Sequence, residues 1–198
     1  MQQRTVETTP ATASVAQRRQ QLLPNGLLGM LIFVIAEVML FAGMISAFMI
    51  VRANAVEWPP PGQPRLPLGQ TAFNTAALLL SGVALWYAGR AFKTWPSQAR
   101  APLAACIALG AVFVIFQGLE WIALLGQGLT LTSSAHGSFF YLIVGSHALH
   151  AVVALGALTW AFALLSRRRL RAGSLWAVSL LWYFVVGIWP ILYLRVYL

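Results

Sequence analysis

Residues 26–51 read GLLGMLIFVIAEVMLFAGMISAFMIV, a run of apolar and small residues interrupted by one charge, Glu37. At about 1.5 Å per residue, a helix of this length crosses a hydrocarbon core of about 30 Å. The segment therefore predicts a transmembrane helix with Glu37 near the middle of the bilayer. An ionised side chain there costs roughly 2.5–3.5 kcal/mol even on the most lenient insertion scale, so we expect Glu37 to be protonated or to face protein, water or a polar partner.

The composition places the whole chain in a membrane. Of its 198 residues, 60% are hydrophobic and 9% charged, and the mean hydropathy is +0.77. Soluble domains carry about 25% charged residues. The net charge of +9 comes from basic residues in short connections between apolar segments, where they set topology and meet lipid headgroups, so nucleic acid is not an expected partner. The single cysteine, Cys106, excludes an intrachain disulfide and a Cys-based metal cluster.

Four further apolar segments follow the first, at residues 69–92, 102–125, 137–165 and 175–198. The sequence therefore predicts an all-α fold, a polytopic bundle of five transmembrane helices spanning residues 25–198. The preceding residues 1–24 lack an apolar period and predict a tail. The third segment offers one face of small residues where another backbone could pack closely: Ala104, Ala108, Ala111 and Gly118.

The distribution of Lys and Arg predicts the orientation. Ten of the thirteen basic residues lie in the tail and in the second and fourth connections, and three lie on the other side. We therefore expect a cytoplasmic N-terminus and a periplasmic C-terminus. The basic residues of the two inner connections are candidates for binding anionic phospholipid headgroups; those considered are Arg90, Lys93, Arg167, Arg168, Arg169 and Arg171.

Two carboxyl groups are candidate functional residues within the helices. Glu37 fits a proton-exchanging or water-binding carboxyl, and equally a protonated acid hydrogen-bonded to a neighbouring helix. Glu120 lies in the outer third of the third segment beside Trp121, where water is nearer. An interfacial structural carboxyl is therefore favoured over a proton site for Glu120.

His147 and His150 are three residues apart and share a helix face. Two neighbours on one turn cannot straddle a haem, no CxxCH motif exists, and His136 is the only other histidine. A mononuclear metal site would need a ligand from another helix, such as Glu37 or Glu120. Polar contacts to another helix or a lipid headgroup are the favoured interpretation. Because no phosphate loop or nucleophilic triad occurs either, an active site within this chain is not expected.

Six segments in order resemble subunit III of the haem-copper respiratory oxidases, the cytochrome c oxidase and ubiquinol oxidase family, from about residue 27 to the end. They are FVIAEVMLFAG (33–43), EWPPPG (57–62), FNTAALLLSG (73–82), FQGLEW (116–121), GSFFYLIVGSHALH (137–150) and WYFVVGIWPILYLRVYL (182–198). The chain departs from the family at Tyr183–Val186, where the usual His-Phe-x-Asp pattern has lost both polar side chains.

The resemblance implies a role for each matching position. Glu37 becomes the family's buried, carbodiimide-sensitive carboxyl. The other positions are polar sites within the bundle or parts of the outer loop; they are Asn74, Glu120, His147 and His150 in the bundle, and Trp58 and Pro59 in the loop.

The resemblance also implies a non-catalytic subunit in the inner membrane of a bacterium, of the shorter five-helix form. Such a subunit packs against oxidase subunit I, with subunit II in the same complex, holds phospholipids, and supports proton uptake and stability. It binds no haem or copper, which belong to its partners. The alternatives are a subunit III-like component of a nitric oxide reductase or another respiratory supercomplex, a stand-alone proton-coupled carrier using Glu37, and a haem-binding cytochrome subunit, which the histidine count disfavours.

Overall fold

The computed structural model describes residues 25–58, 60, 64 and 68–197, so the predicted tail of residues 1–24 and Pro59 lie outside the described residues. Across the described part of the chain there is no strand, and five helices are long and apolar enough to cross a membrane. This confirms the predicted all-α class and the five membrane helices. They are α1 (Asn25–Ala53), α2 (Leu68–Thr94), α3 (Arg100–Gly126), α4 (Ala135–Ser166) and α5 (Ala172–Leu192).

Helices α1 to α4 extend one or two residues beyond the predicted apolar segments at each end, whereas α5 starts three residues earlier than predicted and ends at Leu192 rather than at residue 198. The short 3-10 helix η1 (Pro96–Ala99) connects α2 to α3. At the start of α4, the Ser134 hydroxyl accepts a hydrogen bond from the backbone N–H of Gly137 at 3.1 Å, as an N-cap does. Pro190 lies inside α5, and the chain continues into a π-helical turn, η2 (Tyr193–Tyr197).

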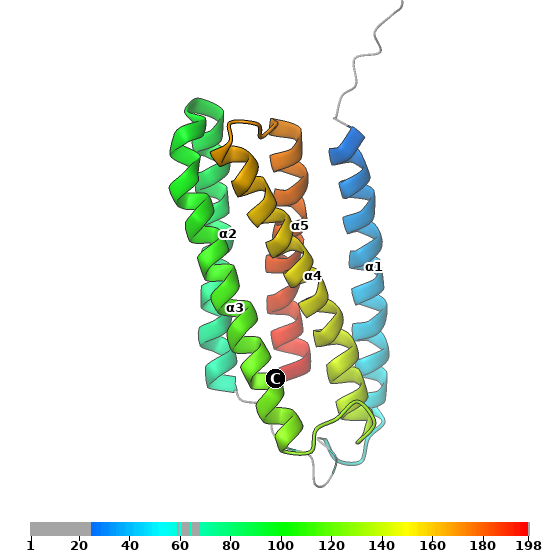
Figure 1. Cartoon of the computed structure of the whole chain (residues 1–198). Coiled ribbons are helices and arrows are strands. Elements are labelled where there is room, and N and C mark those ends of the chain that lie inside the picture. Colours follow the sequence, from blue (N-terminus) through cyan, green and yellow to red (C-terminus); the bar gives the residue numbers. More distant parts are fainter. Residues whose placement is uncertain (1–24, 59, 61–63, 65–67, 198) are drawn as a thin grey trace, which may run out of the picture.

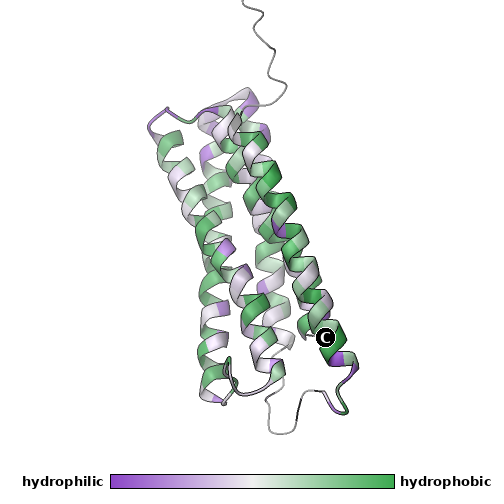
Figure 2. Cartoon of the chain, turned by 90° about the vertical axis from the view of Figure 1, so that its right-hand side faces the viewer, coloured by the Kyte–Doolittle hydropathy of each residue, from purple (hydrophilic) through white to green (hydrophobic). Residues whose placement is uncertain are grey.

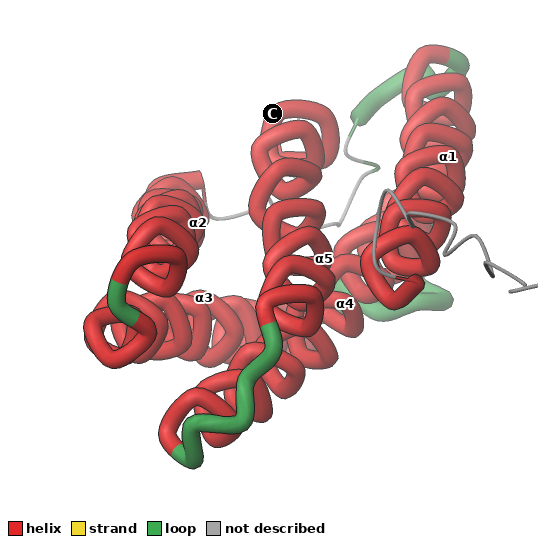
Figure 3. Tube along the Cα trace, turned by 90° about the horizontal axis from the view of Figure 1, so that it is seen from above, coloured by secondary structure: helices red, strands yellow, loops and turns green. Residues whose placement is uncertain are grey.

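Helix α5 is the centre of the bundle. Figure 1 and Figure 3 show α2 and α3 side by side on one side of α5 and α1 on the other, with α4 crossing obliquely between α3 and α1. The burial of the most apolar window of each helix follows this arrangement: it is 56% in α5 but 6% in α1. Helix α1 therefore packs on α4 and α5 by one narrow face and leaves most of its surface open.

The core is filled by aromatic side chains, of which the largest fully buried ones are Trp182, Trp189, Phe41, Phe48 and Phe113. The backbone of α3 comes close to this core at Gly110, where an added Cβ would lie 2.6 Å from the Trp182 ring. The predicted seam of small residues is not the contact within this chain, since Ala104 and Ala108 are exposed. Helix α3 instead buries another face, which includes Leu103, Cys106, Gly110 and Phe113.

Apolar residues also cover the outside of the bundle. Figure 2 shows hydrophobic colour along the helices, with hydrophilic colour gathered at the end that carries the α2–α3 and α4–α5 connections. Large apolar side chains such as Met39, Ile32 and Ile122 are more than 60% exposed. A surface of this kind suits a lipid environment rather than water.

Candidate functional site

Glu37 of α1 and His150 of α4 face one another across the helix interface. The Glu37 Oε2 lies 3.2 Å from the His150 Nε2, and the two side chains are 16% and 15% exposed, respectively. The distance is that of an ion pair or a shared proton, although the atoms are less well aligned than in a full hydrogen bond. The favoured interpretation of His150, a polar contact to another helix, matches this geometry.

The other ring nitrogen of His150 determines where the protons lie. Its Nδ1 is 2.7 Å from the carbonyl oxygen of Ser146. A carbonyl oxygen can only accept, so Nδ1 carries a hydrogen and donates it. In the neutral imidazole Nε2 is then an acceptor, so a hydrogen bond between the two side chains in that form needs a hydrogen on the Glu37 carboxyl. The contact is favourable either between a neutral acid and a neutral imidazole or between a carboxylate and an imidazolium.

Aromatic rings surround this pair. The His150 ring lies 6.2 Å from the ring of Phe33, 5.8 Å from Phe41 and 5.7 Å from Phe184, measured between centroids. Few dipoles are available there to solvate two separated charges. The neutral arrangement avoids that desolvation cost.

Glu120 belongs to a separate polar cluster that joins α2, α3 and the C-terminal turn. Its Oε2 accepts a hydrogen bond from the Thr71 hydroxyl at 3.0 Å, and its Oε1 accepts one from the Tyr197 hydroxyl at 2.9 Å. The Tyr197 oxygen in turn accepts from the Gln117 amide at 3.0 Å. Because both carboxylate oxygens are engaged and the residue is buried, Glu120 has the geometry of a structural link between three segments.

Asn74 lies at the edge of the same cluster. Its amide nitrogen donates to the Phe113 carbonyl at 3.1 Å and approaches the Gln117 side-chain oxygen at 3.4 Å. Its own side-chain oxygen is buried without a hydrogen-bond partner in the described part of the chain. Asn74 therefore links α2 to α3 through its amide nitrogen alone.

His147 points away from Glu37 although it shares a helix with His150. It is 1% exposed, its ring stacks 4.9 Å from Trp189, and neither ring nitrogen has a hydrogen-bond partner among the described residues. The Nε1 of Trp121 is similarly unpartnered, and both residues line a cavity of about 190 Å³ between α3 and α4. A cavity of this size has room for bound water, which would give both polar groups a hydrogen-bond partner.

The histidines and carboxyl groups do not assemble a metal centre. Within the described residues, no three His, Cys, Asp or Glu side chains come together. Glu37 meets His150 alone, Glu120 is bound to hydroxyl groups, and His147 faces an apolar cavity.

The remaining predicted positions lie at the two ends of the bundle. Trp58 packs its ring on Phe48 at 5.5 Å and on His136 at 5.1 Å, which ties the α1–α2 connection to α1 and α4. At the other end, the basic candidates lie near the α2–α3 and α4–α5 connections; Arg90 covers the Trp86 ring at 4.1 Å and Lys93 the Trp176 ring at 4.9 Å. The arginines at positions 167, 168, 169 and 171 are exposed.

Sequence reasoning missed three members of the Glu120 cluster: Thr71, Gln117 and Tyr197. A signal was present, because Thr71 and Asn74 are three residues apart, as are Gln117 and Glu120, so each pair shares a helix face. Two polar pairs on two apolar helices predict that the helices meet along those faces. Nothing in the sequence places Tyr197 opposite them.

Comparison with known proteins gives consistent similarities. The family model described as cytochrome c oxidase subunit III matches residues 11–198. The chain is 32% identical over 207 residues to the probable cytochrome c oxidase subunit 3 of Nocardia farcinica (strain IFM 10152), and the alignment covers 96% of each protein. It is 30% identical over 181 residues to cytochrome c oxidase subunit 3 of Sus scrofa, covering 85% of this chain and 67% of that protein.

Proposed function

The chain belongs to the cytochrome c oxidase subunit III family, and we propose that it is a non-catalytic accessory subunit of a bacterial haem-copper terminal oxidase. The observation that carries this proposal is the match to a bacterial relative over 96% of both chains, whereas the animal relatives are longer. In this role the chain packs on oxidase subunit I in the inner membrane, with its N-terminus on the cytoplasmic side, and serves aerobic electron transport and proton pumping. Haem and copper belong to the partner subunits.

The open surface of α1 supports a role within a larger assembly. Only 6% of its most apolar window is buried by the rest of the chain, so most of the helix must be covered by lipid or by another protein. Bound phospholipid at the basic end and contact with subunit I are both part of the proposal.

The Glu37–His150 pair supports a role in holding a proton at mid-membrane depth. We place the proton of the pair on Glu37, because two separated charges among Phe33, Phe41 and Phe184 would be poorly solvated. Infrared spectra of the assembled complex should show a protonated carboxyl band that disappears in Glu37→Gln and remains in Glu120→Gln. A carboxylate band assigned to Glu37 would contradict this placement.

Copurification tests the main proposal. Chain isolated from its native membrane in mild detergent should carry a haem-bearing partner, and chain expressed by itself should show no haem absorbance and no copper. A partner that reduces nitric oxide rather than oxygen would assign the chain to the alternative assembly. Isolation without any haem-bearing partner, or proton flux by the chain alone in liposomes that Glu37→Gln abolishes, would overturn the proposal in favour of a carrier.

A further inference from the structure

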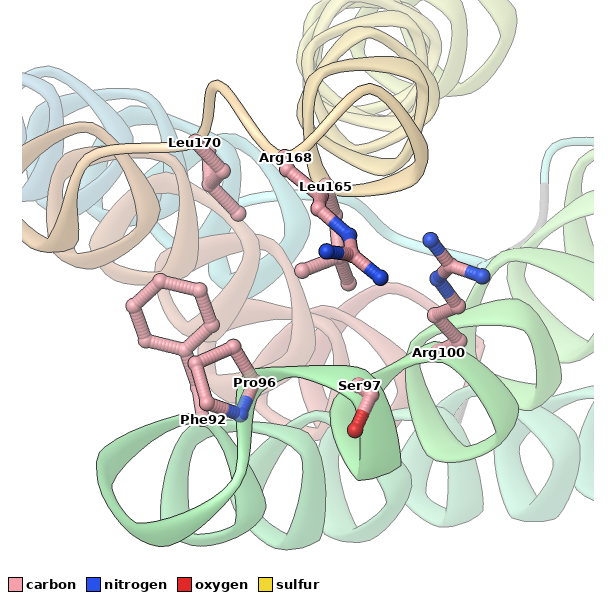
Figure 4. A pocket seen from close by; sticks show the side chains of 7 residues that line it. All are labelled: Phe92, Pro96, Ser97, Arg100, Leu165, Arg168 and Leu170. Carbon is pink, nitrogen blue, oxygen red and sulfur yellow. The ribbon is translucent and has the colours of Figure 1, made fainter.

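The cavities at the two ends of the bundle differ in charge. At the end with the α2–α3 and α4–α5 connections, the guanidinium groups of Arg100 and Arg168 face one cavity (Figure 4). At the opposite end, a cavity of about 460 Å³ lies between the start of α2 and the last turns of α3. Its lining residues are Gly69, Gln70, Phe73 and Asn74 from α2, and Phe116, Leu119, Glu120 and Ala123 from α3. This second cavity can accept a positive charge, which the first would repel.

The lining of the second cavity divides into a buried polar part and an exposed, largely apolar rim. Asn74 and Glu120 are 2% and 7% exposed, whereas the other lining residues are exposed. On the rim, the rings of Phe73 and Phe116 meet edge-on with their centroids 6.4 Å apart. The cavity therefore opens outward beside two aromatic rings, with hydrogen-bonding groups behind them.

The buried polar groups are acceptors that the chain leaves partly unused. The Oδ1 of Asn74 has no hydrogen-bond partner among the described residues. Glu120 accepts hydrogen bonds from the hydroxyl groups of Thr71 and Tyr197, although a carboxylate has about four acceptor sites. No Lys, Arg or His in the described part of the chain lies within ion-pair distance of Glu120. A cation from another molecule would let this carboxyl group ionise without leaving an uncompensated charge inside the bundle.

The depth of the cavity limits what the cation can be. Asn74 is six residues after the start of α2, and Glu120 is six residues before the end of α3. At about 1.5 Å per residue, both lie about 9 Å inside the helix ends, which is just inside a hydrocarbon core of about 30 Å. The ammonium group of a lipid headgroup lies farther out. A lysine on a neighbouring transmembrane helix reaches this depth with its apolar stem along the rim.

We propose that this cavity receives a lysine side chain from a transmembrane helix of a partner subunit, with its ammonium group paired to Glu120 and hydrogen-bonded to the Oδ1 of Asn74. An ammonium group has three rotatable donors, which suit acceptors on two different helices better than the fixed fork of a guanidinium. The rings of Phe73 and Phe116 add cation–π attraction at the entrance. The inference rests on the proposed role in an oxidase assembly, and it assigns the face of α2 and α3 to a partner.

The test is zero-length cross-linking in the complex isolated in mild detergent, with a carbodiimide that couples a carboxyl group to an amine in contact with it. Peptide mass spectrometry of the wild-type complex should show Glu120 joined by an amide bond to a lysine of another subunit. The product should be absent in Glu120→Gln, which has no carboxyl group to activate. It should be kept in Glu57→Gln, which removes an exposed carboxyl group at the same end of the bundle, outside the cavity.

The affinity for the partner, measured by dissociation on dilution in detergent, separates binding from bundle stability. Glu120→Gln should lower this affinity about tenfold, because a neutral amide does not pair with an ammonium group. Tyr197→Phe is the matched control: it removes an internal hydrogen bond to Glu120 but leaves the cavity lining intact, so it should retain the partner as the wild-type chain does. Phe73→Leu changes an exposed ring and should lower the affinity about threefold, which keeps the test decisive if Glu120→Gln fails to fold.

Each outcome decides the proposal. A complex that keeps its partner but yields no bond between Glu120 and a lysine would overturn it, and so would equal losses of affinity in Glu120→Gln and Tyr197→Phe. A product of Glu120 with an aminophospholipid would support the ammonium site and overturn its assignment to a partner's lysine. Isolation of the chain without any haem-bearing partner would overturn the proposed function and this inference with it, whereas a missing cross-link in an intact complex overturns this inference alone.

Discussion

Replacing Gly110 with Ala should destabilise the bundle at the crossing of α3 and α5. The added Cβ would lie 2.6 Å from Cη2 and 2.7 Å from Cζ2 of Trp182, and 3.2 Å from Cδ1 of Leu155. The Trp182 ring is fully buried and its Nε1 donates to the Ser81 hydroxyl at 3.0 Å. The ring therefore cannot move aside without losing a hydrogen bond or displacing other core groups.

The magnitude follows from three contributions. Overpacking a filled core costs about 1–3 kcal/mol. Losing the Trp182–Ser81 hydrogen bond costs about 1 kcal/mol more. The better helix propensity of Ala returns about 1 kcal/mol. The free energy of unfolding should therefore fall by about 1–3 kcal/mol.

Gly118→Ala is the matched control, because it lies on the same helix and its added Cβ would meet nothing within 4 Å. This variant should keep its stability or gain up to about 1 kcal/mol. Both proteins can be unfolded in mixed detergent micelles and followed by circular dichroism and tryptophan fluorescence. If Gly110→Ala proves as stable as Gly118→Ala, the close packing of Trp182 on α3 is wrong. If the Ser81 bond is what restrains the ring, Trp182→Phe should make Gly110→Ala less harmful.

Three further predictions concern the polar groups inside the bundle. Glu37→Leu and His150→Leu each leave one polar partner unpaired and should each lower the free energy of unfolding by about 1–3 kcal/mol. The double variant should recover part of this loss; if the two losses simply add, the residues are not coupled. Tyr197→Phe removes the donor to Glu120 and should lower the unfolding free energy by about 1–2 kcal/mol, with no loss expected if the C-terminal turn is not attached there. His147→Leu removes a ring whose two nitrogens lack hydrogen-bond partners among the described residues, so the free energy of unfolding should stay the same or rise by about 1 kcal/mol. A fall of more than about 2 kcal/mol in that free energy would indicate a water or ligand bound to the ring.

The five helices could be predicted from the sequence because apolar length alone identifies a membrane helix. The apolar runs predicted the ends of the helices to within about three residues, except at the C-terminal end of α5, which stops at Leu192 and is followed by the π-helical turn η2. At the start of α4, the Ser134 cap adds residues that carry no hydropathy signal. The order of six motifs also gave the family, which the matching model and relatives then established.

Packing between helices was harder to predict. A stripe of small residues is a fair guide to close approach, yet α3 turns Gly110 inward and leaves Ala104 and Ala108 on the surface. Which face a helix buries depends on the side chains that the neighbouring helices present to it, here the Trp182 ring. The spacing of small residues along α3 gives no information about those side chains.

The candidate site shows the same division. The position of Glu37 near the middle of its helix could be predicted from the sequence, but not that His147 and His150 have different surroundings. Residues three apart differ by about 60° around a helix, which is enough to aim one ring at α1 and the other at α3. The backbone conformation of Arg168, whose φ is +56°, could not be predicted either. Sequence arguments place glycine at such positions after a helix, and an arginine there is an exception.

The placement of α1 opposite α2 and α3 has a consequence for how the chain is made. Helix α1 packs on α4 and α5, which are synthesised after it, so these neighbours do not yet exist when α1 enters the bilayer. During that interval Glu37 has no His150 to share its proton, and the helix must be held by lipid, by the insertion machinery or by a companion subunit already in place. Assembly of this bundle is therefore limited by the arrival of α4 and α5. A chain truncated before α4 leaves Glu37 in the membrane without His150, and such an unpaired acid exposes the chain to quality-control proteases.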